Sequence, residues 1–248
     1  MITAGQFSIN ALIRELKKDY IKNISIIEFI SDNPVLAVYH EGDSLLVKGL
    51  SDQVWIYISS SDESELKFLL KKLVEDDVHF AFIEDWMIPI VSASKEIDWK
   101  MSALRYYLPI NIETPQNKIP ISRLLPSDAE FIIENSNYKQ FLSIDYITER
   151  IKKSFSAGIY EDGKLIACGL THDDGALGTL HVIDERRRKG YATEITISLI
   201  RQCRENGKIP CAQIVEENLP AINMVNKLGF VKDRRVTWLK LNQHSKRD

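Results

Sequence analysis

A short basic run that contains one glycine, Arg187-Arg188-Lys189-Gly190, has the residue types of a phosphate-binding site. Its three cationic side chains attract an anion, and Gly190 lets the main chain approach a ligand without a side chain in between. A run of like charges is more commonly a solvated surface. The elements on either side of the run therefore decide which interpretation holds.

The residues before and after this run predict a strand and a helix. Residues 179–183 are short and β-prone, and four small or apolar residues after the run recur at helical spacing. These four residues, which would share one face, are Ala192, Ile195, Leu199 and Cys203. The run therefore lies at a helix N-terminus, where unpaired backbone N–H groups and the positive end of the helix dipole converge. This arrangement predicts that the main chain binds phosphate groups.

The pattern Arg187-x-x-Gly190-x-Ala192 after a strand resembles the signature loop of the GNAT superfamily of N-acyltransferases. The resemblance implies an α+β fold, the GNAT acyl-CoA N-acyltransferase fold, in the C-terminal half. It also implies acetyl-CoA or another acyl-CoA as the acyl donor, with no metal ion.

A second segment, residues 218–230, resembles the other cofactor segment of the same superfamily. It begins with Asn218, which is followed by Ala221, and it closes with Leu-Gly-Phe. Its own residues predict a helix, because Pro220 suits a first turn and Gly229 suits the residue after a last turn. The two segments occur in the order found in the family, and the resemblance covers roughly the last half of the chain.

The resemblance also implies which residues contact acyl-CoA. In the family geometry, strands 179–183 and 210–215 start side by side and then splay apart, and pantetheine pairs with backbone groups in the gap as an added strand would. Asn218 either donates a hydrogen bond near the pantetheine or only caps the helix that follows. The expected cofactor-binding residues are Leu180, His181, Val182, Arg187, Arg188, Lys189, Gly190, Tyr191, Ala192, Thr193 and Asn218.

The implied chemistry is attack of a neutral amine on a thioester, which needs a base and a group that binds the oxyanion. The backbone N–H of Val182, at the splay, is the candidate for the oxyanion. The candidate bases are His181, whose side chain titrates near neutrality in the critical strand, Glu216, which ends the neighbouring strand, and Glu217 beside it. Each also has an ordinary structural interpretation, as a strand histidine and as a solvated strand end.

The chain departs from the family pattern at Val225, where many members carry a tyrosine that protonates the leaving thiolate. Tyr191 or a water replaces that donor, or the thiolate leaves unassisted, or the protein binds acyl-CoA without turnover. Two functions therefore stay open. One is an N-acyltransferase acting on the amine of a small molecule or amino acid, and the other is a non-catalytic acyl-CoA-binding or interaction protein.

The order of segments resembles the glycine N-acyltransferase-like branch in particular. The resemblance is carried by Leu124-Leu125-Pro126, by the segment 156–160 and by Asp162-Gly163. The acceptor pocket itself has no diagnostic motif. Side chains that suit a carboxylate or an aromatic ring, but that also have structural interpretations, are Arg105, Arg123 and Trp99.

The N-terminal half predicts a similar order of elements without a phosphate loop, and we expect it to be a degenerate copy of the same fold. An unrelated α+β domain is the alternative. Where the loop would stand, residues 59–64 read SSSDES, whose acidic groups repel a pyrophosphate. A proline-rich linker separates the expected domains, 1–112 and 121–248. The expected elements are helices over 7–20, 61–76 and 98–108, β-rich segments at 23–30, 34–42, 43–49 and 52–59, and a strand over 79–83.

Composition excludes several other classes of protein. A chain of 248 residues with a net charge of −3 does not suggest a dedicated nucleic-acid binder. Cys168, Cys203 and Cys211 lie in apolar surroundings without metal-ligand spacing, so we expect reduced core residues. No apolar run reaches membrane-spanning length. We expect a cytoplasmic monomer or homodimer whose partner is a small-molecule amine or amino acid, and neither nucleic acid nor a membrane.

Overall fold

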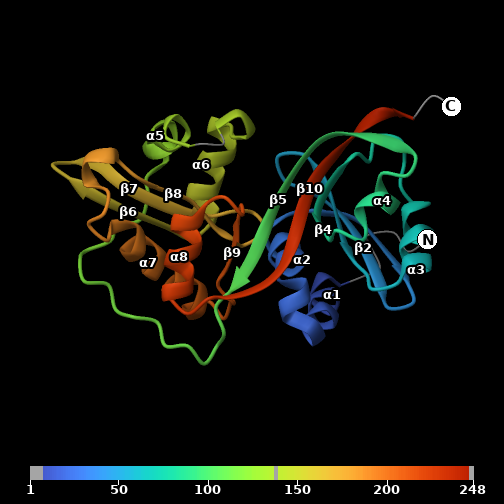
Figure 1. Ribbon diagram of the computed structural model, residues 1–248, viewed down its shortest axis with the longest axis horizontal. Helices are drawn as coiled ribbons and strands as arrows, with labels where there is room; N and C mark the ends of the chain where they lie inside the picture. Colours follow the sequence, from blue (N-terminus) through green and yellow to red (C-terminus); the bar gives the residue numbers. More distant parts are fainter. Residues whose placement is uncertain (1–7, 137–138, 246–248) are drawn as a thin grey trace. The chain divides into compact units, whose positions relative to one another are not determined.

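The computed structural model describes residues 8–136 and 139–245 of the chain, which form two compact units (Figure 1). The first unit contains Met1–Arg105 together with Asp233–Asp248, and the second contains Tyr106–Lys232. Phe7, the first residue of the helix predicted over 7–20, lies outside the described residues. We expected residues 233–245 in the C-terminal domain, whereas they cluster with the first unit.

The first unit is a sheet with helices that flank it. Its sheet has the strand order β1-β2-β3-β4-β10-β5, in which β1, β2 and β3 form an antiparallel meander and β3 and β4 are parallel. Its strands are β1 (Val35–Glu41), β2 (Ser44–Leu50), β3 (Val54–Ser59), β4 (His79–Ile83), β5 (Lys95–Tyr107) and β10 (Val231–Ser245). Its helices are α1 (Ile9–Leu16), α2 (Tyr20–Asp32), α3 (Glu63–Leu70) and α4 (Ile88–Val91), with a 3₁₀ turn at Lys17–Asp19.

The second unit has an antiparallel three-stranded sheet, β6-β7-β8, with helices on both faces (Figure 1). Side chains of α5 and α6 pack on one face, and side chains of α7 pack on the other. Its strands are β6 (Ser156–Glu161), β7 (Lys164–Thr171), β8 (Leu177–Val182) and β9 (Cys211–Ile214). Its helices are α5 (Ala129–Glu134), α6 (Ile144–Lys153), α7 (Tyr191–Glu205) and α8 (Leu219–Lys227), with 3₁₀ turns at Pro126–Asp128, Lys139–Phe141 and Asp184–Arg186.

Both units follow the same order of elements. Each has two helices, three antiparallel strands, a helix, a strand parallel to the third strand, and a further helix. In the second unit the parallel relation is a bridge between Ala176 and Cys211, at the starts of β8 and β9. This shared order confirms the prediction that the N-terminal half is a copy of the fold found in the C-terminal half.

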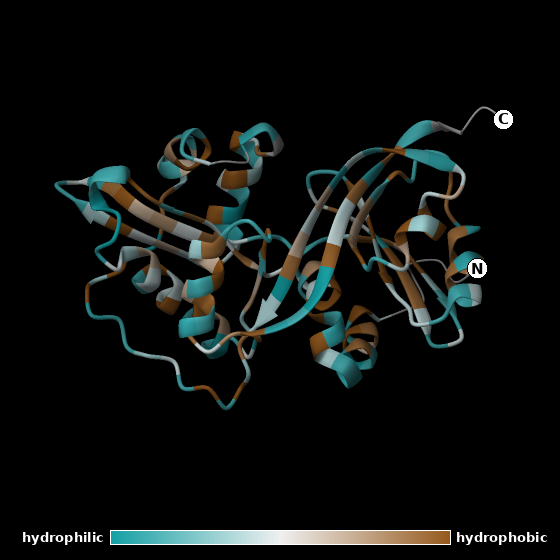
Figure 2. Ribbon diagram, viewed as in Figure 1, coloured by the Kyte–Doolittle hydropathy of each residue, from teal (hydrophilic) through white to brown (hydrophobic). Residues whose placement is uncertain are grey.

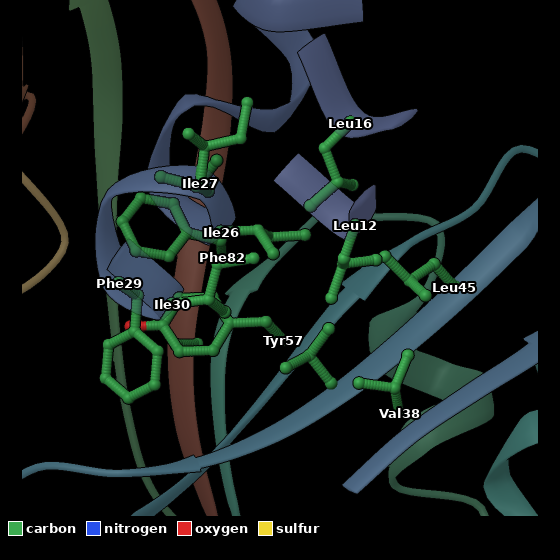
Figure 3. Packing of buried hydrophobic residues seen from close by; sticks show 13 residues of the cluster. Leu12, Leu16, Ile26, Ile27, Phe29, Ile30, Val38, Leu45, Tyr57 and Phe82 are labelled. Atoms are coloured by element: carbon green, nitrogen blue, oxygen red, sulfur yellow. The ribbon is translucent and has the colours of Figure 1, made fainter. Parts of the chain in front are cut away.

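The prediction of a strand at residues 23–30 was wrong, because these residues belong to α2. All eight are buried, and Figure 3 shows Ile26, Ile27, Phe29 and Ile30 packed toward side chains of α1 and the sheet. Figure 2 shows mostly hydrophobic colouring along α2. A helix that is buried on all sides has no polar stripe, so its sequence has the same appearance as a buried strand.

The prediction of a helix over 98–108 was also wrong, because residues 95–107 form β5. Over its first six residues the exposure alternates between half-buried and exposed, which is the period of two expected of a strand with one covered face. The apolar residues within it are too few to distinguish this period from a helical one. Tertiary pairing with β10 therefore decided the structure.

β10 is held in the first unit by an ion pair that it makes with β5. Arg105 is buried, and its Nε donates to Asp233 Oδ2 at 2.8 Å, while its Nη2 donates to Ile21 O at 2.9 Å. The guanidinium therefore links β5, β10 and α2. These hydrogen bonds give Arg105 a structural role within this unit.

We expect Asp233→Asn to destabilise the first unit by about 3 kcal/mol, because it leaves a buried guanidinium without its counter-charge. Urea unfolding followed by tryptophan fluorescence measures this. The matched control is Asp98→Asn, which removes the partner of Lys240 in a half-exposed pair of the same unit and should cost under about 1 kcal/mol. Equal losses in both variants would contradict the structural role of the Arg105 pair.

Candidate functional site

The loop between β8 and α7 has the backbone geometry of an anion site. Arg188 and Gly190 have positive φ angles of 62° and 87°, and no side chain caps the N-terminus of α7. In the described part of the chain, the first amide of α7 with a carbonyl partner is that of Glu194, which donates to Gly190 O at 3.1 Å. The N–H groups of the first three helical residues, 191–193, therefore point out of the helix end, where an anion is favoured.

Gly190 has open space where a side chain would project, since no heavy atom lies within 4 Å of the position that a Cβ would take. The glycine is therefore not required by packing against the protein. Its left-handed backbone favours glycine, and the open space leaves room for a ligand beside the main chain. Both properties agree with the sequence prediction for this loop.

The basic residues of the loop do not all have the same role. Arg187 pairs with Asp184 at 2.7 Å, and its Nε donates to Val182 O at 3.2 Å, so it fastens the loop to β8. Arg186 pairs with Glu161, the last residue of β6, at 2.7 Å. Arg188, Lys189 and Arg187 are exposed, which leaves cationic groups at the helix N-terminus.

β8 and β9 begin side by side and then separate, as the sequence analysis expected. The bridge from Ala176 to Cys211 joins their starts, yet the two strands belong to different sheets. Within β8 the pairing with β7 shifts register between Gly178 and His181, and Thr179 has a φ of 50°. This is a β-bulge, which places one extra residue in β8 and redirects the chain at the level of the splay.

His181 lies on the sheet face that α5 and α6 cover. The residue paired with His181 on β7 is Cys168, which packs with those helices. The His181 ring contacts the ring of Phe131 of α5 edge to face, with 6.0 Å between the ring centroids. Its Nε2 is buried and has no hydrogen-bond partner among the described residues. Burial lowers the pKa of His181, Arg187 lowers it further, and Asp184 opposes the shift. The imidazole is therefore neutral near pH 7, with a nitrogen that can accept a proton.

The remaining predicted site residues lie near β9 and α8. Glu216 is exposed in the turn after β9, and Asn218 is the N-cap residue of α8, whose Oδ1 accepts from Ala221 N at 3.2 Å. Of the two roles considered for Asn218, the structure has the hydrogen bond of the helix cap. Leu180 and Val182 flank His181 on β8, and Tyr191, Ala192 and Thr193 form the first turn of α7.

Val225 of α8, at the position where the family resemblance predicts a thiolate proton donor, is a buried aliphatic residue. The alternative donor, Tyr191, has its hydroxyl directed elsewhere: it donates to Glu161 Oε1 at 3.2 Å. This hydrogen bond raises the pKa of Tyr191. In this conformation neither Val225 nor Tyr191 presents a proton to the splay.

Several contributors to the site have no local sequence signal. The bulge at Thr179 lies within an ordinary β-prone segment, and Phe131 reaches His181 from a helix fifty residues earlier. The predicted linker also lies against α7, since Asn117 Nδ2 donates to Glu194 O at 2.7 Å and Lys118 N–H donates to Glu194 Oε2 at 2.9 Å. These contacts depend on tertiary structure, so only a three-dimensional arrangement identifies them.

The other candidate arginine for the acceptor pocket, Arg123, is also structural. Its Nη2 donates to the carbonyl groups of Ile151 and Lys152, at the end of α6. Among the described residues no cluster of three or more His, Cys, Asp or Glu side chains is arranged to hold a metal ion. In the same part of the chain, no helix has the length and apolar character needed to cross a bilayer.

Residues 156–239 match the family described as FR47-like protein, a range that contains β8, the basic loop, α7 and α8. No curated protein matches the chain. An X-ray structure of a Drosophila protein is similar over 95% of this chain and 96% of its own, with a TM-score of 0.78 and 16% identity.

Two further solved structures share the fold. A GCN5-related N-acetyltransferase from Kribbella flavida covers 89% of this chain and 94% of its own, with a TM-score of 0.59 and 13% identity. A tandem GNAT protein from the clavulanic acid biosynthesis pathway covers 97% of both chains, with a TM-score of 0.55 and 13% identity. The tandem protein spans nearly the whole chain, in agreement with two copies of one fold.

Proposed function

We propose that this chain, which has the fold of the GCN5-related N-acetyltransferases (GNAT), transfers an acetyl or other acyl group from acyl-CoA to the amine of a small molecule or amino acid. The observation that carries the proposal is the uncapped N-terminus of α7, next to a strand that is bulged and splayed from its neighbour. Such a helix end takes a pyrophosphate, and the splay exposes backbone groups of β8 to an extended ligand.

The reaction needs little more than positioning, one base and an oxyanion donor. The amine nitrogen bonds to the thioester carbon, and His181 Nε2 takes a proton from the nitrogen. The C–S bond then breaks with its electron pair on sulfur, and the thiolate takes up a proton to leave as free thiol. The backbone N–H of Val182 is the proposed oxyanion donor, and the main chain of Leu180 and Val182 pairs with the pantetheine. Glu216 is the alternative base, acting through water.

Non-catalytic binding of acyl-CoA is the second candidate function. The observation that favours it is the lack of a presented proton donor, since Val225 is buried and the Tyr191 hydroxyl is bonded to Glu161. Both functions predict that coenzyme A binds. Turnover separates them.

The test of the proposed function is a panel of amines and amino acids, each incubated with acetyl-CoA and with longer acyl-CoAs. Release of free thiol that depends on the amine would support the transferase. Binding of acetyl-CoA by calorimetry without thiol release for any amine would favour the non-catalytic protein. Absence of binding would contradict both.

The short segments at 124–126 and 156–160 favour acceptors of the glycine N-acyltransferase-like branch, so glycine and other small amino acids belong in the panel. Leu124 is buried with α5 and α6, on the face that carries His181, which supports a role of this segment in shaping the acceptor side. We further propose a cytoplasmic location and a monomeric or homodimeric state.

We expect one coenzyme A per chain, because the corresponding site of the first unit is occupied by the protein itself. Asp62 caps α3, with its Oδ1 accepting from the N–H groups of Ser64 and Glu65, so a carboxylate already fills the anion position. β3 and β4 are also paired at two successive positions, whereas β8 and β9 share one isolated bridge. Calorimetric titration should give a stoichiometry of one; a value of two would show that the first unit is a second working site.

A further inference from the structure

A second imidazole lies beside the bulge of β8. His172 directly follows the last residue of β7 and begins the turn to β8. Its ring covers Gly178, because a Cβ on that glycine would overlap Nε2 and Cδ2 of the ring. The ring therefore takes the place that a side chain at position 178 would occupy. The side chain over position 178 is therefore contributed by a residue outside β8.

His172 and His181 lie on the same face of β8, on opposite sides of the bulge at Thr179. Gly178 pairs with Leu170, and His181 pairs with Cys168. Leu170 and Cys168 are two positions apart on β7 and both pack against α5 and α6, so their partners on β8 point to that face as well. The two imidazoles therefore flank the redirected segment of the strand.

The hydrogen bonds of His172 leave one ring nitrogen available. Tyr146 of α6 places its hydroxyl 3.4 Å from His172 Nδ1 and 3.4 Å from Asp173 Oδ1. A carboxylate only accepts, so the hydroxyl donates to Asp173 and its oxygen accepts from Nδ1–H of the imidazole. That tautomer leaves a lone pair on Nε2. Both distances are long for hydrogen bonds, as is common at reacting groups before substrate binds.

The surroundings of His172 favour its neutral form. Burial lowers its pKa, Asp173 opposes this, and Arg150 lowers the pKa further. Arg150 is among the most deeply buried side chains described, and its Nε has no hydrogen-bond partner among the described residues. The titratable and charged groups that face the ring are thus Tyr146 and Arg150 from α6 and Asp173 from the turn. Asp174 of the same turn accepts a hydrogen bond from Ala176 N–H.

We propose that His172 is a second proton-accepting residue of this site, held in place by Tyr146 and Asp173, on the side of the bulge where the acceptor amine arrives. The proposal rests on the proposed function. The phosphate loop follows the C-terminal end of β8, so a pantetheine lying along the strand runs back toward the bulge. The acceptor then approaches from beyond it, where Gly178 and the His172 ring lie.

The two imidazoles correspond to the two protons that an ammonium ion loses when it becomes an amide. At neutral pH an alkylamine is an ammonium ion, and His172 Nε2 takes its first proton, which frees the lone pair. The nitrogen then bonds to the acyl carbon, and His181 takes the second proton from the tetrahedral intermediate. The C–S bond breaks with its electron pair on sulfur, the thiolate receives the proton held by His181, and the proton on His172 passes to solvent.

The tautomer of His172 provides a test that does not require turnover. In ¹⁵N-histidine-labelled protein near pH 7.5, with the resonances identified by comparison with His172→Gln, we expect the proton on Nδ1. Tyr146→Phe removes the hydroxyl that fixes this tautomer and should shift the proton toward Nε2. A wild-type ring that carries its proton on Nε2 would overturn the proposal, whatever the protein proves to catalyse.

The kinetic test separates the two histidines. His172→Gln should lower kcat/KM for the amine on the order of 100-fold at neutral pH and leave the affinity for acetyl-CoA unchanged. The kcat/KM of this variant should recover as the pH approaches the pKa of the amine. Tyr146→Phe should show a smaller loss with the same recovery. Tyr20→Phe, which removes a hydroxyl that donates to Glu28 in the first unit, is the matched control and should keep the wild-type pH profile.

Unaltered kinetics in both variants, or a loss that is equal at every pH, would contradict this role of His172. Failure of the wild-type protein to bind acetyl-CoA would instead contradict the proposed function, and the tautomer measurement would remain valid. If His172→Gln does not fold, as judged by circular dichroism, Tyr146→Phe and its control decide the result.

Discussion

Gly190→Asp is expected to abolish detectable binding of coenzyme A while the protein stays folded. The new carboxylate would lie at the N-terminus of α7, where the phosphates bind, and would repel them. The side chain has room, because no heavy atom lies within 4 Å of the position that its Cβ would take. Aspartate also tolerates a left-handed backbone better than most residues, so the cost in stability is on the order of 1 kcal/mol.

Two control variants separate charge from backbone strain. Gly190→Asn has nearly the same shape without the charge, and should retain more affinity than Gly190→Asp. Gly207→Asp places the same side chain at another open glycine with positive φ, just after the C-terminal end of α7. Calorimetry should show wild-type affinity for this last variant, and wild-type affinity for Gly190→Asp would remove the basis of the phosphate site.

His181→Ala is expected to lose on the order of 100-fold in turnover, which is the usual contribution of a general base. Affinity for acyl-CoA should change little, since β8 contributes backbone groups to the ligand at this position. Glu216→Gln is the comparison, because it removes a carboxylate at almost constant volume. A loss confined to Glu216→Gln would transfer the role of base to that residue, and full activity in both variants would leave the proton to water.

The pH dependence of the wild-type rate gives an independent measurement. The neutral form of His181 is the active one, so the rate should rise with pH through its pKa and then level off. Burial and Arg187 lower that pKa, so the rise should be complete at a lower pH than for a histidine with the ordinary value of about 6.5. A rise centred well above that value would assign the limiting proton to another group, such as the amine.

The parts of the site that sequence predicted are those with local signals. The helical spacing after Gly190 and the proline at the start of α8 are signals that extend over only a few residues. Each predicts a helix, and both helices are present. α2 and β5 were assigned wrongly because their sequences have no feature that separates a buried helix from a strand, or the period of two of a strand from a helical period. The choice between them was made by packing partners distant in the chain.

The contacts that shape the reacting centre could not be predicted from local sequence patterns, because their partners are also distant in the chain. His172 has the sequence context of a turn residue, and nothing near it in the chain indicates that its ring would cover Gly178. The bulge at Thr179 likewise results from the pairing of β8 with β7 and not from an unusual residue. Sequence therefore identified the cofactor side of the site, and the acceptor side required the structure.

The position of β10 between β4 and β5 has a consequence for how the protein is made. The second unit is continuous in sequence and is complete once residue 232 has been synthesised, whereas the first unit receives its central strand only from the residues that follow. During synthesis, β4 and β5 therefore have open edges for as long as the whole second unit takes to emerge. Open edges of this kind invite pairing with other chains. The half of the molecule that is translated first is thus the last to finish folding, and it is the half that chaperones would be expected to protect.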